Sequence, residues 1–100
     1  MNPFFDDLGR RWTKAAAGYG AELEPPTLAP RVAEELLELA RVTAHTEERR
    51  FAPLACFTAG LAMERLRTSR PDLDDSALVA CIREVRTGIE ADYAARAATS

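Results

Sequence analysis

The sequence predicts an all-α protein, a four-helix bundle-like single domain over residues 1–100. Apolar residues recur at spacings of three and four along most of the chain, which is the period of one helix face. No segment shows the strict alternation of apolar and polar residues that is typical of a strand. Residues that favour helix starts stand between these segments, so short connections should join helices that pack side by side.

Each expected helix has its own start signal. Asn2 and Asp74 are the expected N-caps of the first and last helices, and Thr27 can cap the second. Pro53 is expected in the first turn of the third helix, where proline is tolerated. The helices are therefore expected over residues 3–19, 28–45, 53–68 and 74–97, with a proline-containing linker over residues 20–27.

The third helix is expected at the centre of the bundle. It is apolar nearly all round before Glu64, and small residues such as Ala59 and Gly60 would let a neighbouring helix come close. The second helix should bury a broad apolar face that includes Leu36, Leu37 and Leu39. Its opposite face, with Glu34, Glu35 and Glu38, is expected to be solvated.

Charge and hydropathy exclude several classes of protein. The formal net charge of −3 argues against a nucleic-acid binder, which needs a dense basic face. The longest uncharged run, residues 51–63, is 13 residues long, whereas a membrane-spanning helix needs about 20. The N-terminal MNPFFDD carries acids and no basic segment, so no secretory signal is expected. We expect a cytoplasmic protein with no nucleic-acid or membrane partner.

The cysteines give no sign of a metal site or a disulfide scaffold. Cys56 and Cys81 lack the spacing of a zinc site, and they are expected to remain free thiols. With one histidine in the chain, no metal ligand set, cofactor site or catalytic residue emerges. An enzyme is therefore the less favoured class.

The candidate site is the corner between the second and third expected helices. His45 ends the second helix, and Arg49 and Arg50 directly precede the start of the third. Guanidinium groups beside the free backbone N–H groups of a helix start can hold an anion. The alternative is structural, because the same side chains can serve the carbonyl end of the second helix and pair with the neighbouring glutamates. We predict anion or partner binding at His45, Arg49 and Arg50.

The same region carries a resemblance to a known family. The stretch LLELARVTAHTEERRFAPLACFTAGLA contains L-x-L-A-R-x-x-A-H, then P-L after seven residues, then F and G. It resembles the signature of a family of small helical domains of unknown function from high-GC bacteria, also found fused to molybdenum cofactor guanylyltransferases. The matching residues are Leu37, Leu39, Ala40, Arg41, Ala44, His45, Pro53, Leu54, Phe57 and Gly60.

The resemblance implies a link to molybdoenzyme maturation and carries no catalytic residues. It makes a molybdenum cofactor nucleotidyltransferase or a formate dehydrogenase maturation factor the expected partner. The favoured function is thus a non-enzymatic accessory or protein-interaction domain. Two alternatives stay open: a small enzyme or binding module for a phosphorylated or nucleotide-like ligand at the His45 corner, and a structural homodimer held by helix faces.

Overall fold

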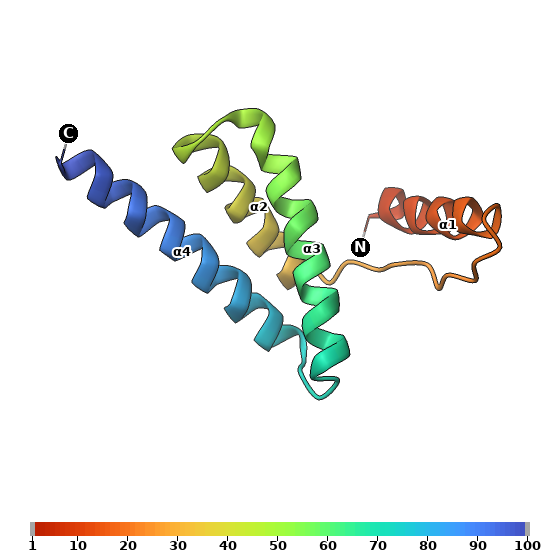
Figure 1. The fold of residues 1–100 in the computed structure, drawn as a ribbon. Coiled ribbons are helices and arrows are strands. Elements are labelled where there is room, and N and C mark those ends of the chain that lie inside the picture. Colours follow the sequence, from red (N-terminus) through yellow and green to blue (C-terminus); the bar gives the residue numbers. More distant parts are fainter. Residues whose placement is uncertain (1, 100) are drawn as a thin grey trace. The chain divides into compact units, whose positions relative to one another are not determined.

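All regular structure in residues 2–99, the part of the chain that the computed structural model describes, is helical. There are four α-helices and one short 3₁₀ turn, so the all-α, bundle-like class is confirmed (Figure 1). The elements are α1 (Pro3–Ala17), α2 (Pro30–Thr46), η1 (Arg49–Phe51), α3 (Ala52–Ser69) and α4 (Asp75–Thr99).

Contacts along the chain group into two compact units, which are described separately. The first ends at Pro30 and contains α1, and the second begins at Arg31 and contains the remaining helices. The expectation that residues 1–100 form a single domain stays a prediction.

In the first unit, α1 begins as expected and ends two residues early. The Asn2 side chain accepts a hydrogen bond of 2.8 Å from the N–H of Phe4, which is the expected N-cap, and Pro3 follows it. After Ala17 the backbone turns through three successive i to i−3 hydrogen bonds. It then reaches Gly20 at a φ of 79°, a conformation that favours glycine and prevents continuation of the helix.

The linker lies against α1 and is longer than expected. The Thr13 hydroxyl donates to the carbonyl of Leu23 at 2.9 Å. A Cβ on Gly9 would stand 2.8 Å from the carbonyl oxygen of Pro26, so this close approach requires glycine. Helix α2 starts at Pro30 and not at residue 28, because a proline disfavours the helical conformation of the residue before it.

In the second unit, α2, α3 and α4 lie side by side (Figure 1). The buried apolar residues come from α2 and α4 alone: Leu39, Val42, Leu78, Val79 and Ile82. The predicted N-cap of α4 is confirmed, since the Asp74 carboxylate accepts a hydrogen bond from the N–H of Ala77 at 3.1 Å.

The expected central position of α3 is wrong. None of its residues is buried, whereas Leu54, Phe57 and Leu61 are 61%, 67% and 41% exposed. Its half-buried side carries the small residues Ala52, Ala55, Cys56 and Ala59, together with Met63 and Leu66. The Cys56 thiol donates to the carbonyl of Leu36 at 3.5 Å, whereas Leu54, Phe57 and Leu61 lie on the outer face.

Candidate functional site

The corner predicted from the sequence has a defined geometry. Helix α2 ends at Thr46, Glu48 is extended (φ −115°, ψ 144°), and η1 follows at once and leads directly into α3. The extended residue reverses the chain within two positions. His45 and the two arginines therefore lie on opposite sides of a tight bend.

His45 faces α4. Its exposed ring packs edge-on against Tyr93, with ring centroids 5.5 Å apart and an interplanar angle of 64°. The hydroxyl of Thr46, the next residue, donates to the carbonyl of Val42 at 2.9 Å. The observed contact of His45 thus joins the ends of α2 and α4, as a structural role requires.

Arg50 and Arg49 differ in their surroundings. The Arg50 guanidinium is 2.6 Å from the Glu48 carboxylate and lies over the ring of Phe51, 5.7 Å from its centroid. Within residues 2–99, the Arg49 side chain has no hydrogen bond or ion pair, and the residue is exposed. No contact in the described chain joins either arginine to His45.

The backbone at this helix start is partly occupied. The N–H of Phe51 donates to the carbonyl of Glu48 at 3.0 Å, and the N–H of Ala52 donates to Arg49. The turn of η1 thus uses two N–H groups that a helix beginning at Pro53 would have left free. The anion site at His45, Arg49 and Arg50 stays a prediction, now centred on Arg49.

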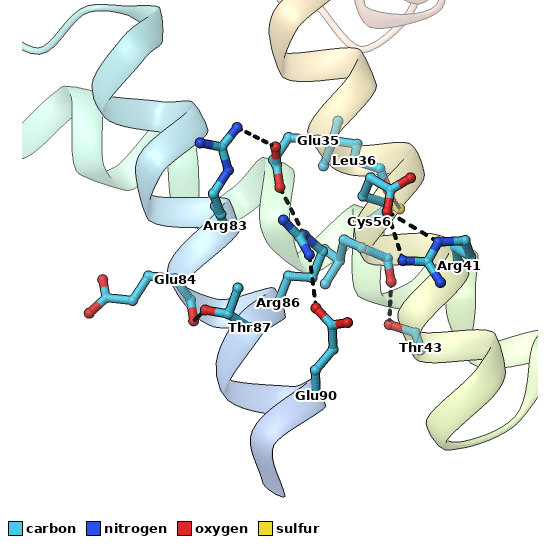
Figure 2. A network of polar contacts seen from close by, with 12 residues as sticks. Glu35, Leu36, Arg41, Thr43, Cys56, Arg83, Glu84, Arg86, Thr87 and Glu90 are labelled. Atoms are coloured by element: carbon cyan, nitrogen blue, oxygen red, sulfur yellow. Dashed lines mark hydrogen bonds and ion pairs between the residues drawn. The ribbon is translucent and has the colours of Figure 1, made fainter. Parts of the chain in front are cut away.

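A polar cluster between α2 and α4 was missed by sequence reasoning. Glu35 is only 5% exposed, and its carboxylate accepts hydrogen bonds from Arg83 at 3.1 Å and Arg86 at 2.9 Å (Figure 2). Arg86 also donates to Glu90 at 2.8 Å. The expectation that Glu35 is solvated is wrong, whereas Glu34 and Glu38 are exposed.

Sequence spacing holds the signal for this burial. Glu35 stands four and seven residues before Leu39 and Val42, so all three share one face of α2, and the guanidinium partners come from α4. Burial raises the pKa of Glu35, but the hydrogen bonds from Arg86 and Arg83 outweigh it and hold that pKa below its ordinary value. A carboxylate that two arginines keep ionised connects α2 to α4 and is a poor general base.

An apolar hollow of the second unit lies between α3 and α4. It has a volume of about 330 Å³ and is also lined by Leu39 of α2. Among its lining side chains, Thr58 carries a hydroxyl and Cys81 a thiol. The walls are Ala55, Thr58, Ala59, Ala62 and Met63 of α3 and Cys81, Ile82, Val85 and Ile89 of α4. We call this hollow the α3–α4 groove.

The described residues offer little chemistry. No group of three metal-ligating side chains occurs within residues 2–99, and both cysteines are free thiols, as predicted. Burial raises the pKa of the Cys56 thiol, which disfavours the nucleophilic thiolate. In the part of the chain described, no helix has the length and apolar character to cross a membrane.

The fold defines a small all-α domain with an apolar groove between α3 and α4. The chain belongs to the family described as domain of unknown function (DUF6457), whose model matches residues 6–98. Comparisons with curated proteins and with solved structures gave no match.

Proposed function

We propose that the protein is a non-enzymatic accessory domain that binds a partner protein through the α3–α4 groove. The observation that carries the proposal is the composition of the groove, which is apolar apart from one hydroxyl and one thiol. Sites of catalysis or small-molecule binding normally combine apolar walls with several converging polar groups. A groove without them favours burial of apolar side chains from another chain.

The titratable groups support this assignment. The carboxylates whose pKa is lowered are Asp7, Glu35, Glu38 and Asp72, and each is hydrogen-bonded to an arginine of its own unit. Such pairing keeps a carboxylate ionised, whereas an acid–base catalyst needs a pKa near neutrality. These ion pairs therefore hold helices and turns in place.

An amphipathic helix is the occupant that the groove fits best. The two helical walls, with Leu39 between them, can take a row of apolar side chains at positions i, i+3 or i+4, and i+7. Exposed carboxylates, Glu84 and Asp92, flank the α4 wall just before Val85 and just after Ile89. The charges favour a partner helix with lysine or arginine beside its apolar face.

The resemblance found in the sequence suggests where to look for this partner. We propose a cytoplasmic molybdenum cofactor nucleotidyltransferase or a formate dehydrogenase maturation factor, because the resemblance implies a link to molybdoenzyme maturation. The support for this choice is the sequence resemblance.

The test measures binding of each purified candidate to the full chain by isothermal titration calorimetry. Val85→Asp puts a charge on the groove wall at a residue that is 54% exposed, so the fold should tolerate it. The matched control is Leu37→Asp, on an apolar side chain of α2 that is 70% exposed and outside the groove. We expect Val85→Asp to weaken binding more than tenfold, roughly the effect of 1.4 kcal/mol, and Leu37→Asp to leave it unchanged.

The outcomes separate the two halves of the proposal. If neither candidate binds, the molybdoenzyme assignment fails. If a candidate binds and Val85→Asp has no more effect than Leu37→Asp, the groove is not the interface.

A second candidate function is recognition of a phosphorylated or nucleotide-like ligand at the corner. The observation that favours it is the exposed Arg49 guanidinium, which has no hydrogen bond or ion pair within residues 2–99, next to Arg50. Its test is given in the Discussion.

A further inference from the structure

We propose that the outer face of α3 binds the same face of a second copy of this chain, in an antiparallel, two-fold symmetric pair. We call this the α3 face, and its members are exposed: Arg50, Pro53, Leu54, Phe57, Gly60, Leu61 and Glu64. None of them lines the α3–α4 groove, so this inference goes beyond the proposed function.

The spacing of these residues along the chain places them on one side of α3. Phe57 and Glu64 are seven residues apart in α3, which is two helical turns, so they mark the centre line of the face. Arg50 stands seven residues before Phe57, in the turn η1 that leads directly into α3. Leu54 and Leu61 follow one flank of that line, and Pro53 and Gly60 follow the other. The face is uncharged between one basic and one acidic end.

The charges at the two ends of the α3 face are complementary to those of a second copy. A two-fold axis at Phe57 reverses the helix direction and places position i of one copy beside position 114 − i of the other. Arg50 then lies beside the second copy's Glu64, and this contact occurs twice. Charge complementarity therefore favours a second copy in this orientation, whereas a parallel pair would set like charges side by side.

The residues on the two flanks of the α3 face can also pack against a second copy. Leu54 and Leu61 fall on the same side in both copies, so each leucine of one copy packs against the other leucine of its mate. Pro53 of one copy lies next to Gly60 of the other, and a Cβ at Gly60 meets nothing within 4 Å in its own chain. The open space at Gly60 can accept the proline ring.

The exposed apolar area of the α3 face is large enough for a weak interface. Leu54, Phe57 and Leu61 together expose roughly 350 Å² per chain, taking about 200 Å² for a fully exposed leucine or phenylalanine. The largest apolar patch on an ordinary monomer is about 300–600 Å². The three residues of both copies would bury roughly 700 Å², with further area from the flanking residues, so the pair lies in the range of weak, reversible complexes.

Arg50 is available for this contact at little cost. Its present pair with Glu48 is on the surface, where the Arg50 side chain is 80% exposed, and an exposed pair contributes little stability. The guanidinium can thus turn from Glu48 to the carboxylate of the second copy.

The primary test is sedimentation equilibrium of the full chain between about 5 and 500 μM, the range in which a weak pair forms. We expect a reversible monomer–dimer equilibrium with a dissociation constant inside that range. A protein that stays monomeric throughout overturns the proposal.

Charge reversal tests the register. Arg50→Glu alone and Glu64→Arg alone each create two like-charged contacts, and each should weaken the dimer by about tenfold, equivalent to 1.4 kcal/mol. An equimolar mixture of the two variants restores both opposite-charge contacts, so it should form a heterodimer about as stable as the unmodified dimer. If the mixture dimerises no better than its components, the antiparallel register is wrong.

Substitutions at two glycines distinguish an effect on dimerisation from an effect on folding. Gly60→Gln should keep or raise the unfolding midpoint of the monomer, because glutamine favours a helix over glycine and the site is open. The same change fills the space for Pro53 and should weaken the dimer. Gly88→Gln in α4, also with nothing within 4 Å of a Cβ, is the matched control and should leave dimerisation unchanged. Equal effects of both variants on dimerisation overturn the assignment of the α3 face.

Discussion

At the scale of single residues, Glu35 connects two helices of the second unit. It is a buried carboxylate on α2 with two guanidinium partners on α4, and so it ties these helices at one register. Glu38, one turn later, makes an exposed pair with Arg41 on the same helix. Two glutamates of one helix therefore have different roles, which the environment decides.

Replacing Glu35 should destabilise the protein. Glu35→Gln removes one of the two carboxylates that pair with the mostly buried Arg86 guanidinium and leaves Glu90 as the other. We expect a loss of about 2 kcal/mol in the free energy of unfolding, since breaking one side of a buried pair leaves its remaining charge less compensated. Urea denaturation measures this loss. The control, Glu38→Gln, should cost clearly less, and equal losses would contradict the special role of Glu35.

The pH dependence of stability should also reflect the ion pairs of Glu35. The pKa of Glu35 is lower in the folded chain than in the unfolded chain, so the unfolded state binds more protons as the pH falls. The stabilisation is therefore complete above the ordinary glutamate pKa of about 4.3 and is lost as the pH falls through the folded value. Denaturation at a series of pH values should show a shallower acid-side slope for Glu35→Gln than for the unmodified protein. Parallel curves would contradict this.

Arg49 decides whether the corner binds anions. Phosphate or pyrophosphate should shift the amide resonance of Arg49 in an NMR titration, because the guanidinium is exposed and free of other contacts in the described residues. Arg49→Ala should weaken binding about tenfold, and Arg49→Lys less, because lysine keeps the charge but loses the two-pronged geometry. Arg65→Ala, at another exposed arginine, is the control. An unchanged spectrum removes the anion site.

At the scale of elements, α1 and the linker form a unit whose geometry depends on one glycine. The linker carbonyl of Pro26 approaches Gly9 so closely that no side chain fits between them. The hollow above this contact is lined by Phe5, Leu8 and Trp12 together with linker residues. The linker is therefore packed chain and not a free tether.

Gly9→Ala should detach the linker locally. The added Cβ would stand 2.8 Å from the Pro26 oxygen, and the backbone must move to relieve the contact. Cleavage by a glutamate-specific protease after Glu22 and Glu24 should become several-fold faster. Gly88→Ala, at an open position of α4, should leave cleavage unchanged and raise stability by up to about 1 kcal/mol. Equal cleavage rates would show that the contact is unimportant.

At the scale of the whole molecule, the exposure of large apolar residues is the dominant property. Among residues 2–99, only five apolar residues form the buried core, while side chains as large as Trp12, Phe57 and Tyr19 are exposed. Burial of apolar surface is the main favourable term in folding, so the isolated chain should be only marginally stable. Association with another chain would add the missing burial.

Thermal stability should therefore depend on protein concentration. If two copies associate in the folded state only, mass action raises the melting temperature as the concentration rises. Differential scanning calorimetry between about 10 and 300 μM should show an increase of a few degrees. Phe57→Asn removes the ring at the proposed axis and should abolish the increase. A melting temperature independent of concentration would contradict association.

Local sequence signals determined the helical class and most helix starts. Asn2 and Asp74 cap their helices as predicted. Pro30 sets where α2 begins, because a proline restricts the backbone of the residue before it. The candidate corner was also placed correctly at the junction of α2 and α3, because capping and turn chemistry act over a few residues.

Tertiary structure alone decided which faces are buried. Glu35 is buried beside two arginines of α4 that neutralise it, whereas Leu37 of the same helix is 70% exposed. Leu54, Phe57 and Leu61 on the outer face of α3 are exposed, whereas the half-buried side of the same helix carries Ala55, Cys56 and Ala59 together with Met63 and Leu66. A hydrophobic pattern states what a helix could bury, and the neighbouring elements, distant in sequence, decide what it does bury.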